Sequence, residues 1–128
     1  MTLGQYIRLV LTADAGVFAL VGARVYSETM PQSPDLPLVV YGQSARLDDQ
    51  ALDGPTGVQR LVVQVDSWAK TRAEATALGA AVVAALSGHS GAADGLSVQG
   101  VFLGSERWDY EPEVDLYRTA HDYEVWIS

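Results

Sequence analysis

The sequence predicts an α+β fold: a mainly antiparallel sheet of about five strands with two or three helices packed on one face. Two observations carry this prediction. Apolar residues recur at helical spacing near the N-terminus and again over 71–86, whereas residues 60–69 alternate between apolar and polar. The predicted order is helix, three strands, helix, two strands, and a chain of 128 residues is expected to form a single domain over 1–128.

The first helical segment covers residues 2–22 and is interpreted as one kinked helix or two short ones. Thr2 can cap its start, with Gln5 as the reciprocal partner of a capping box. Asp14 is a second candidate cap in the middle of the segment, and Gly22 is a typical helix stop.

Five further segments have the composition or the alternation of strands. They are Val25–Ser27, Leu38–Gln43, Arg60–Ala69, Leu96–Ser105 and Leu116–Ile127. In the third of them, Leu61, Val63 and Val65 share one face. The clearest helix is predicted over Thr71–Leu86, where many Ala and Gly positions would let a neighbouring element approach closely. If the strands before and after this helix are parallel, the three elements can form one right-handed crossover.

Two connections stand out from the rest. Ala45–Gly57 is thirteen residues long, and a loop far longer than an ordinary hairpin turn is usually functional or mobile, so we expect loop 45–57 to project from the domain. Its candidate contact residues are Arg46, Leu47, Asp48, Asp49, Leu52, Asp53, Gly54, Pro55, Thr56 and Gly57. The second connection is an acidic loop with two aromatic residues, whose candidate residues are Glu106, Trp108, Asp109, Tyr110, Glu111, Glu113 and Asp115.

Composition and charge exclude several classes of function. Apolar residues make up 48% of the chain, as in globular proteins, and the lack of cysteine excludes disulfides and thiolate metal sites. The formal net charge is −8, of which residues 94–128 carry −6 with eight acids and two bases. Such a surface repels phosphate, so we expect neither specific nucleic-acid binding nor attraction to anionic membranes. The longest apolar run has ten residues, and we expect no membrane span and no signal peptide.

The sequence holds no motif for catalysis or metal binding. Some carboxylates could bind Mg²⁺ or act as acid and base, but adjacent or extended acids mostly point apart. They are Asp48 with Asp49, and Glu111, Glu113 and Asp115. The two histidines, His89 and His121, have no further ligands at zinc spacing and are expected to be structural or surface residues. Neither a G-x-S-x-G elbow nor a phosphate-binding glycine motif is present. We therefore expect no enzymatic activity, cofactor or metal.

An ordered set of short sequence words covers nearly the whole chain. The words are ADAGVFALVGARVY (13–26), LPLVVY (36–41), LDGPTG (52–57), VQVDSWA (63–69), AEATALGAAVVAAL (73–86), DYEPE (109–113), LYR (116–118) and DYEVW (122–126). Together they resemble the tail-completion family of long-tailed phages and prophages, whose members act as tail terminators or tail-to-head joining proteins. The chain also resembles the family to which the tail terminators of gene transfer agents belong.

The resemblance implies a homo-hexameric ring on top of the tail tube, at the head–tail junction of the virion, built from subunits made in the bacterial host cytoplasm. The ring would bind the tail tube protein, stop tube growth and offer a docking surface to a head-completion or connector protein. DNA would pass through its hole without specific binding. The LDGPTG word falls on Leu52–Gly57, in the loop expected to reach neighbouring subunits, the tube or the lumen. The acidic loop is expected to face the lumen or a partner.

Two other classes stay open. Another head–tail adaptor or a tail-tube ring protein would share the small size and the extended loops, although a tube subunit polymerises alone while a terminator stops at one ring. A small ligand-binding or hydrolytic α+β domain would use the acidic loop, and it would need a pocket together with a ligand or metal response.

Overall fold

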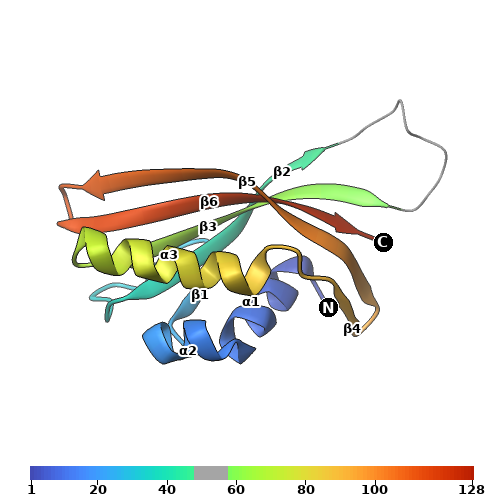
Figure 1. The fold of residues 1–128 in the computed structure, drawn as a ribbon, viewed down its shortest axis with the longest axis horizontal. Helices are drawn as coiled ribbons and strands as arrows, with labels where there is room; N and C mark the ends of the chain where they lie inside the picture. Colours follow the sequence, from blue (N-terminus) through green and yellow to red (C-terminus); the bar gives the residue numbers. More distant parts are fainter. Residues whose placement is uncertain (48–57) are drawn as a thin grey trace.

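The computed structural model describes residues 1–47 and 58–128, which fold into three helices and one six-stranded sheet (Figure 1). The elements are α1 (Leu3–Ala13), α2 (Ala15–Val21), β1 (Val25–Ser27), β2 (Leu38–Leu47), β3 (Gln59–Ala69), α3 (Arg72–Leu86), β4 (Gly91–Ala93), β5 (Leu96–Glu111) and β6 (Leu116–Ile127). The strand order is β1-β2-β3-β6-β5-β4, and every neighbouring pair is antiparallel except β1 with β2. This confirms the predicted α+β class.

The N-terminal segment forms two helices bent by 86° relative to each other. The predicted capping box is present, because the Thr2 hydroxyl accepts from the Gln5 backbone N–H and the Gln5 side chain accepts from the Thr2 N–H. Asp14 makes the break: its backbone is extended, and its carboxylate accepts from the Val17 N–H at 3.0 Å to start α2. Of the two predicted alternatives, two short helices are therefore correct, and the second ends at Gly22 with a φ of 57°.

Helix α3 lies close to β6, as its small residues predicted. Thr71 caps its N-terminus by accepting from the Glu74 N–H at 3.1 Å. A Cβ placed on Gly79 would lie 2.9 Å from Thr119 Cγ2 and 3.0 Å from His121 Cε1, which leaves no room for a methyl group. The glycine thus sets the distance between helix and sheet.

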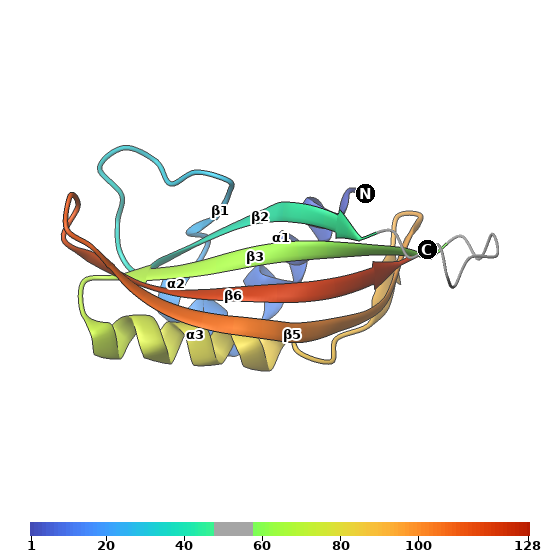
Figure 2. The ribbon, with the colours of Figure 1, turned by 90° about the horizontal axis from the view of Figure 1, so that it is seen from above.

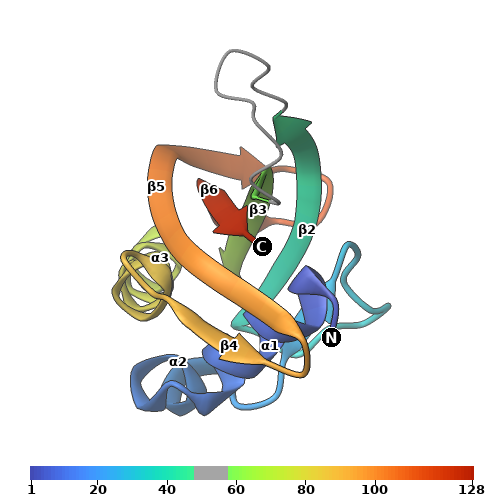
Figure 3. The same cartoon turned by 90° about the vertical axis from the view of Figure 1, so that its right-hand side faces the viewer.

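The helices and one face of the sheet enclose the core. In Figure 2, α3 runs along one side of the sheet, and Figure 3 shows how strongly the sheet curls. Leu61, Val63 and Val65 share one face of β3, as predicted, and all three are buried against the helices. The alternate residues of β3 and β6 point to the opposite side, which we call the open face of the sheet.

Two predicted strand boundaries are wrong, and one strand was not predicted. β2 continues past Gln43 to Leu47, so that Arg46 and Leu47 pair with Leu61 and Arg60 of β3 instead of lying in a loop. β5 continues past Ser105 to Glu111, so most of the predicted acidic loop is a strand that pairs with β6, and only a short turn at 112–115 remains. The short strand β4 lies between the helix predicted over Thr71–Leu86 and the strand predicted from Leu96, where the sequence predicted no strand.

The crossover around α3 joins parallel strands that are not neighbours. β3 and β5 are each antiparallel to β6, so they run in the same direction, but β6 lies between them. The helix therefore spans one strand of the sheet and packs on β3 and β6.

Candidate functional site

The predicted acidic loop is a β-hairpin that presents different residues on its two faces. We call residues 105–119 the β5–β6 arm. Residues directly opposite each other in antiparallel strands share a face, so Trp108 opposite Thr119 and Tyr110 opposite Tyr117 lie on the side of α3. Asp109, opposite Arg118, lies on the open face. The predicted candidates therefore do not form one acidic surface.

Two aromatic side chains of the arm are exposed to solvent. Trp108 is 59% and Tyr110 is 47% exposed, and the Tyr110 ring lies 4.8 Å from the Tyr117 ring. The Tyr110 hydroxyl donates a hydrogen bond to Asp115 at 2.6 Å, and this bond raises the pKa of Tyr110 above its usual value. The arm thus carries a fixed aromatic surface of the kind that is enriched in protein interfaces.

Helix α3 holds the arm through its first residue. The Arg72 guanidinium donates to the carbonyl of Asp109 at 2.6 Å and to the carbonyl of Arg118 at 3.1 Å, which ties it to both strands of the hairpin. The same guanidinium lies 5.2 Å from the centre of the Tyr117 ring. Because both strands are braced, the arm is ordered before it meets any partner.

The acids of the arm fall into two groups. The carboxylates of Glu106, Asp109 and Asp115 are bound by His121, Arg118 and Tyr110, respectively. Glu111 and Glu113 are exposed and make no side-chain hydrogen bond or ion pair within residues 1–47 and 58–128. The sequence analysis expected the whole acidic loop to face a partner or to repel phosphate. Among the acids of the arm, only Glu111 and Glu113 have carboxylates left to do so.

Both histidines contact a side chain from a distant part of the chain. His121 is 1% exposed on the α3 side of β6, where its Nε2 lies 2.9 Å from Glu106 Oε2. His89 lies 2.8 Å from the Tyr6 hydroxyl and fixes the connection after α3. This supports the structural role expected for both.

The open face carries alternating arginines and carboxylates. Arg60 binds Glu124 at 2.8 Å, and Arg107 binds Asp122 at 2.8 Å. Arg118 lies between Asp109 at 2.6 Å and Asp66 at 3.6 Å. Tryptophan rings flank two of these arginines, with Trp126 at 5.2 Å from Arg60 and Trp68 at 5.3 Å from Arg118. The positive charge of this face is therefore compensated locally, although the sequence analysis did not single out these pairs.

The pKa shifts follow from these contacts. The hydrogen bond from Arg60 lowers the pKa of Glu124. Burial raises the pKa of Asp66 despite the hydrogen bond from Gln64 and the charge of Arg118. Such shifts are typical of a structural ion-pair network, and they do not by themselves mark an active site.

The long-loop candidates lie mostly outside the described residues. Arg46 and Leu47 are in β2, as stated above. The others, Asp48, Asp49, Leu52, Asp53, Gly54, Pro55, Thr56 and Gly57, belong to residues 48–57, which the structure does not describe.

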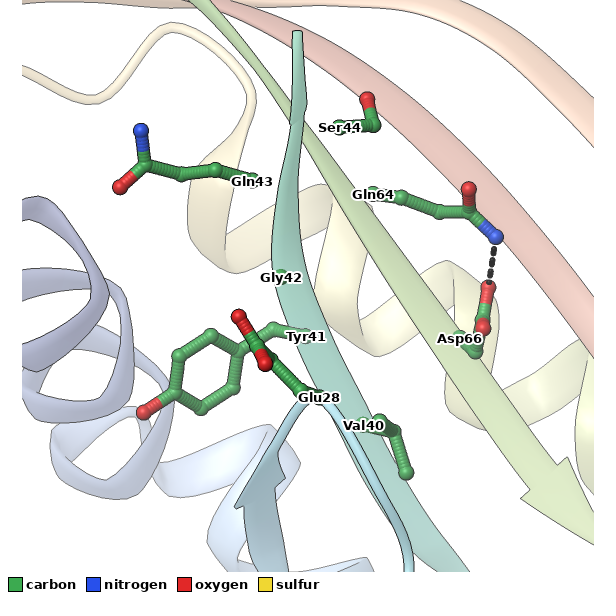
Figure 4. A pocket seen from close by; sticks show the side chains of 8 residues that line it. All are labelled: Glu28, Val40, Tyr41, Gly42, Gln43, Ser44, Gln64 and Asp66. Atoms are coloured by element: carbon green, nitrogen blue, oxygen red, sulfur yellow. Dashed lines mark hydrogen bonds between the residues drawn. The ribbon is translucent and has the colours of Figure 1, made fainter.

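A shallow pocket of about 250 Å³ lies beside β1, β2 and β3 (Figure 4). Its Asp66 carboxylate accepts from Gln64 at 2.9 Å, and its Ser44 hydroxyl donates to the Val62 carbonyl at 3.4 Å. The lining contains no histidine to activate that serine. In the described ranges, no three His, Asp or Glu side chains come together as metal ligands. The pocket offers no hydrolytic arrangement.

Within 1–47 and 58–128, no single helix is long and apolar enough to cross a membrane. α1 and α2 reach that length and composition only as a pair, and this pair is bent.

The described residues present a braced, exposed hairpin and a charge-compensated sheet face, and the buried histidine of the core is bound to Glu106. A family model described as "Tail completion protein gp17" matches residues 5–128. The chain therefore belongs to the tail completion protein gp17 family, a family of structural phage tail proteins and not of enzymes.

One solved structure extends the comparison. The chain is similar to a protein in the structure titled "Virion of native gene transfer agent (GTA) particle", with 26% sequence identity and a TM-score of 0.72. The match covers 98% of this chain and 93% of that one. No curated protein sequence matches the chain significantly. These findings agree with the resemblance noted from the sequence words and identify a structural, tail-related virion protein.

Proposed function

We propose that the protein is a tail terminator, a subunit that forms a ring, caps the tail tube and presents the surface to which the head joins. Membership of a tail completion family supports a role in the tail. The observation that carries the proposal further is the β5–β6 arm, which is exposed and aromatic yet fixed by Arg72 and has no reactive group to serve. An ordered surface of this kind is suited to contact with another protein.

The proposed partners are further copies of this chain in a homo-hexamer, the tail tube protein, and a head-completion or connector protein. Loop residues 46–57 are proposed to reach a neighbouring subunit or the tube. The arm is proposed to face the lumen or a partner.

DNA is proposed to pass through the ring without being held. The arginines of the open face already bind carboxylates, so they add little attraction for phosphate. The exposed Glu111 and Glu113 repel phosphate wherever they face the path of the DNA. A conduit with weak repulsion lets the polymer slide.

Native mass spectrometry and electron microscopy of the purified full chain, alone and with tail tubes, test the proposal. A terminator gives a finite ring and one ring at the tube end, because its two faces differ. Open filaments formed by this protein alone would identify a tube subunit instead. Binding to the portal side of heads with no affinity for tubes would identify a head–tail adaptor.

A further inference from the structure

We infer that copies of this chain join edge to edge, with Gly100–Leu103 of β5 pairing antiparallel with Gln43–Leu47 of β2 in the next copy. The inference deepens the proposed ring and rests on it for its biological meaning. It names the strand edges that form the contact between subunits.

Both outer strands are much longer than the short strands that cover them. β4 pairs only with Leu96–Val98 of the sixteen-residue β5, and β1 pairs only with Val39–Tyr41 of the ten-residue β2. In the described parts of the chain, the outer edge of β5 after Val98 and of β2 after Gly42 has no neighbouring strand. Unpaired strand edges are templates for pairing with another chain.

These two edges lie at the same level of the sheet. Following the register across the strands, Ala45 lies level with Val62, Glu124 and Phe102. In the same way, Gln43 lies level with Leu103. A second copy placed beside the first, without a shift along the strands, therefore brings Ala45 opposite Phe102. It brings Gln43 opposite Leu103, because the register of β2 shifts between Gln43 and Ala45.

The direction of the strands fits this pairing. β2 and β5 run in opposite directions within one sheet, because each of the pairs β2–β3, β3–β6 and β6–β5 is antiparallel. Copies related by rotation about an axis along the strands keep these directions. β2 of one copy then meets β5 of the next as an ordinary antiparallel pair.

The β5 edge lacks the features that keep monomeric proteins from pairing at this level. Gly100–Gly104 contains no charge and no proline, and Phe102 and Leu103 are 55% and 40% exposed. The nearest charged side chains are Glu106 and Arg107, and they bind His121 and Asp122 on the neighbouring strand β6. They therefore do not prevent another strand from pairing with this edge. Soluble monomers usually place outward charges or proline at such positions.

A partner β2 fits this edge better than a second β5 does. Antiparallel pairing of two β5 edges centred on Phe102 and Leu103 would push the arm of each copy against β4 of the other, which occupies the outer side of Leu96–Val98. In a partner β2, residues 43–47 contain no acid and no proline.

The paired stretch is short, and its end is marked in the structure. Beyond Leu103 the arm reaches the level where β1 covers β2 in a neighbouring copy. The register of β5 with β6 shifts between Leu103 and Ser105, and such a bulge bends the strand away from its former line. The contact uses two different edges of the subunit, so it is heterologous and closes into a ring only when the rotation divides a full turn.

Engineered disulfides test the pairing, because the chain has no native cysteine. Opposite residues in antiparallel strands have Cα atoms about 4.5–5.5 Å apart, within reach of a disulfide. A bridge formed within one copy would leave the subunit at the mass of a monomer on the gel, so it is distinguished from a link between copies. The test variant is Ala45→Cys with Phe102→Cys, and the control is Ala45→Cys with Trp108→Cys, whose second position is equally exposed but lies at the wrong level.

Both variants are oxidised in the assembled state and on tail tubes, then separated on a denaturing gel without reductant. We expect a ladder of linked subunits for the test variant and at most traces of linked subunits for the control. A separate Leu103→Lys variant is expected to fold, as judged by circular dichroism, but to assemble at least tenfold more weakly. Rings that form without linkage through 45 and 102 would overturn the edge pairing and leave the terminator proposal standing. Linked open filaments would support the pairing and overturn the terminator. Absence of any assembly, alone or on tubes, would overturn both.

Discussion

His121 and Glu106 join the two strands of the arm at its base: His121 Nε2 lies 2.9 Å from Glu106 Oε2, directly opposite in the β5–β6 register. The imidazole is 1% exposed and packs against α3 beside Gly79, while the carboxylate is 39% exposed. A buried polar ring in the sheet thus takes its partner from the strand that carries the exposed aromatic residues. This contact gives the histidine a structural role and links the two strands at the base of the arm.

Removing the carboxylate leaves a buried imidazole nitrogen without its partner. Glu106→Ala is expected to lower the free energy of unfolding by about 1 kcal/mol, because a buried polar group loses its hydrogen bond. The same change made in a His121→Leu background is expected to be nearly neutral. Urea denaturation of the four proteins of this double-mutant cycle measures the coupling. Equal effects of Glu106→Ala in both backgrounds would show that the contact does not stabilise the fold.

Gly79 and Gly4 are expected to respond oppositely to substitution by alanine. Gly79→Ala forces a methyl group to 2.9 Å from Thr119 Cγ2, and such overpacking costs about 1–3 kcal/mol, more than the helix propensity of alanine returns. Gly4→Ala meets Tyr41 Cε2 at an ordinary 3.5 Å and is expected to stabilise the protein by about 0.5 kcal/mol. Thermal unfolding of both variants checks the two signs. A stabilising Gly79→Ala would mean that α3 can move away from β6.

Two carboxyl groups of the open face are expected to shape acid unfolding in opposite ways. The lowered pKa of Glu124 means that its stabilising contribution is present above its unfolded pKa and is lost as pH falls through the folded value. The raised pKa of Asp66 means that its ionisation costs stability as pH rises from the unfolded pKa through the folded one. Between about pH 6 and pH 3, Glu124→Gln should therefore flatten the fall in unfolding free energy, and Asp66→Asn should steepen it. Urea titrations across this range give the slopes, and the reverse order would contradict the assignment.

Local signals made much of the fold predictable. Thr2 with Gln5, Asp14 and Thr71 are caps whose partners lie three residues away, so the sequence alone contains both halves of each interaction. The alternation of Leu61, Val63 and Val65 correctly assigned the core face of β3.

The arm was misassigned because strand pairing is a long-range property. The sequence analysis assigned the acids of this segment to a loop. In the structure, Glu106, Trp108 and Tyr110 lie on one face of a strand, and Arg107 and Asp109 lie on the other. The segment is a strand because it pairs with β6. Residues 106–111 alone contain no signal that predicts this pairing.

The β4 strand could have been found from its turn. Gly91–Ala93 has little strand propensity, but Asp94-Gly95 is a strong two-residue hairpin signal, and both residues have positive φ values, 46° and 84°. The free edge of β5 also has a readable signal, namely an uncharged stretch without proline at Gly100–Gly104. Its significance depends on the strand order, which no local pattern contains.

DNA binding is expected to depend on the carboxylates of the open face. The native protein should show no binding to duplex DNA at physiological salt, because Arg60, Arg107 and Arg118 are already bound to acids. Combining Asp109→Asn, Asp122→Asn and Glu124→Gln should produce weak binding that disappears as salt is raised. Fluorescence anisotropy with a labelled duplex measures both. Saturable binding by the native protein at physiological salt would contradict the passive-conduit proposal.

The length distribution of tails assembled with and without this protein, measured by electron microscopy, tests the central claim most directly. A terminator must bind the growing tube end and present an opposite face to which no further tube subunit can add. Without the protein, tubes should overrun their normal length and fail to join heads, and purified protein added early should restore a single length with one ring per tube end. Tubes that keep a narrow, normal length and still carry heads in its absence would show that the protein is not the terminator.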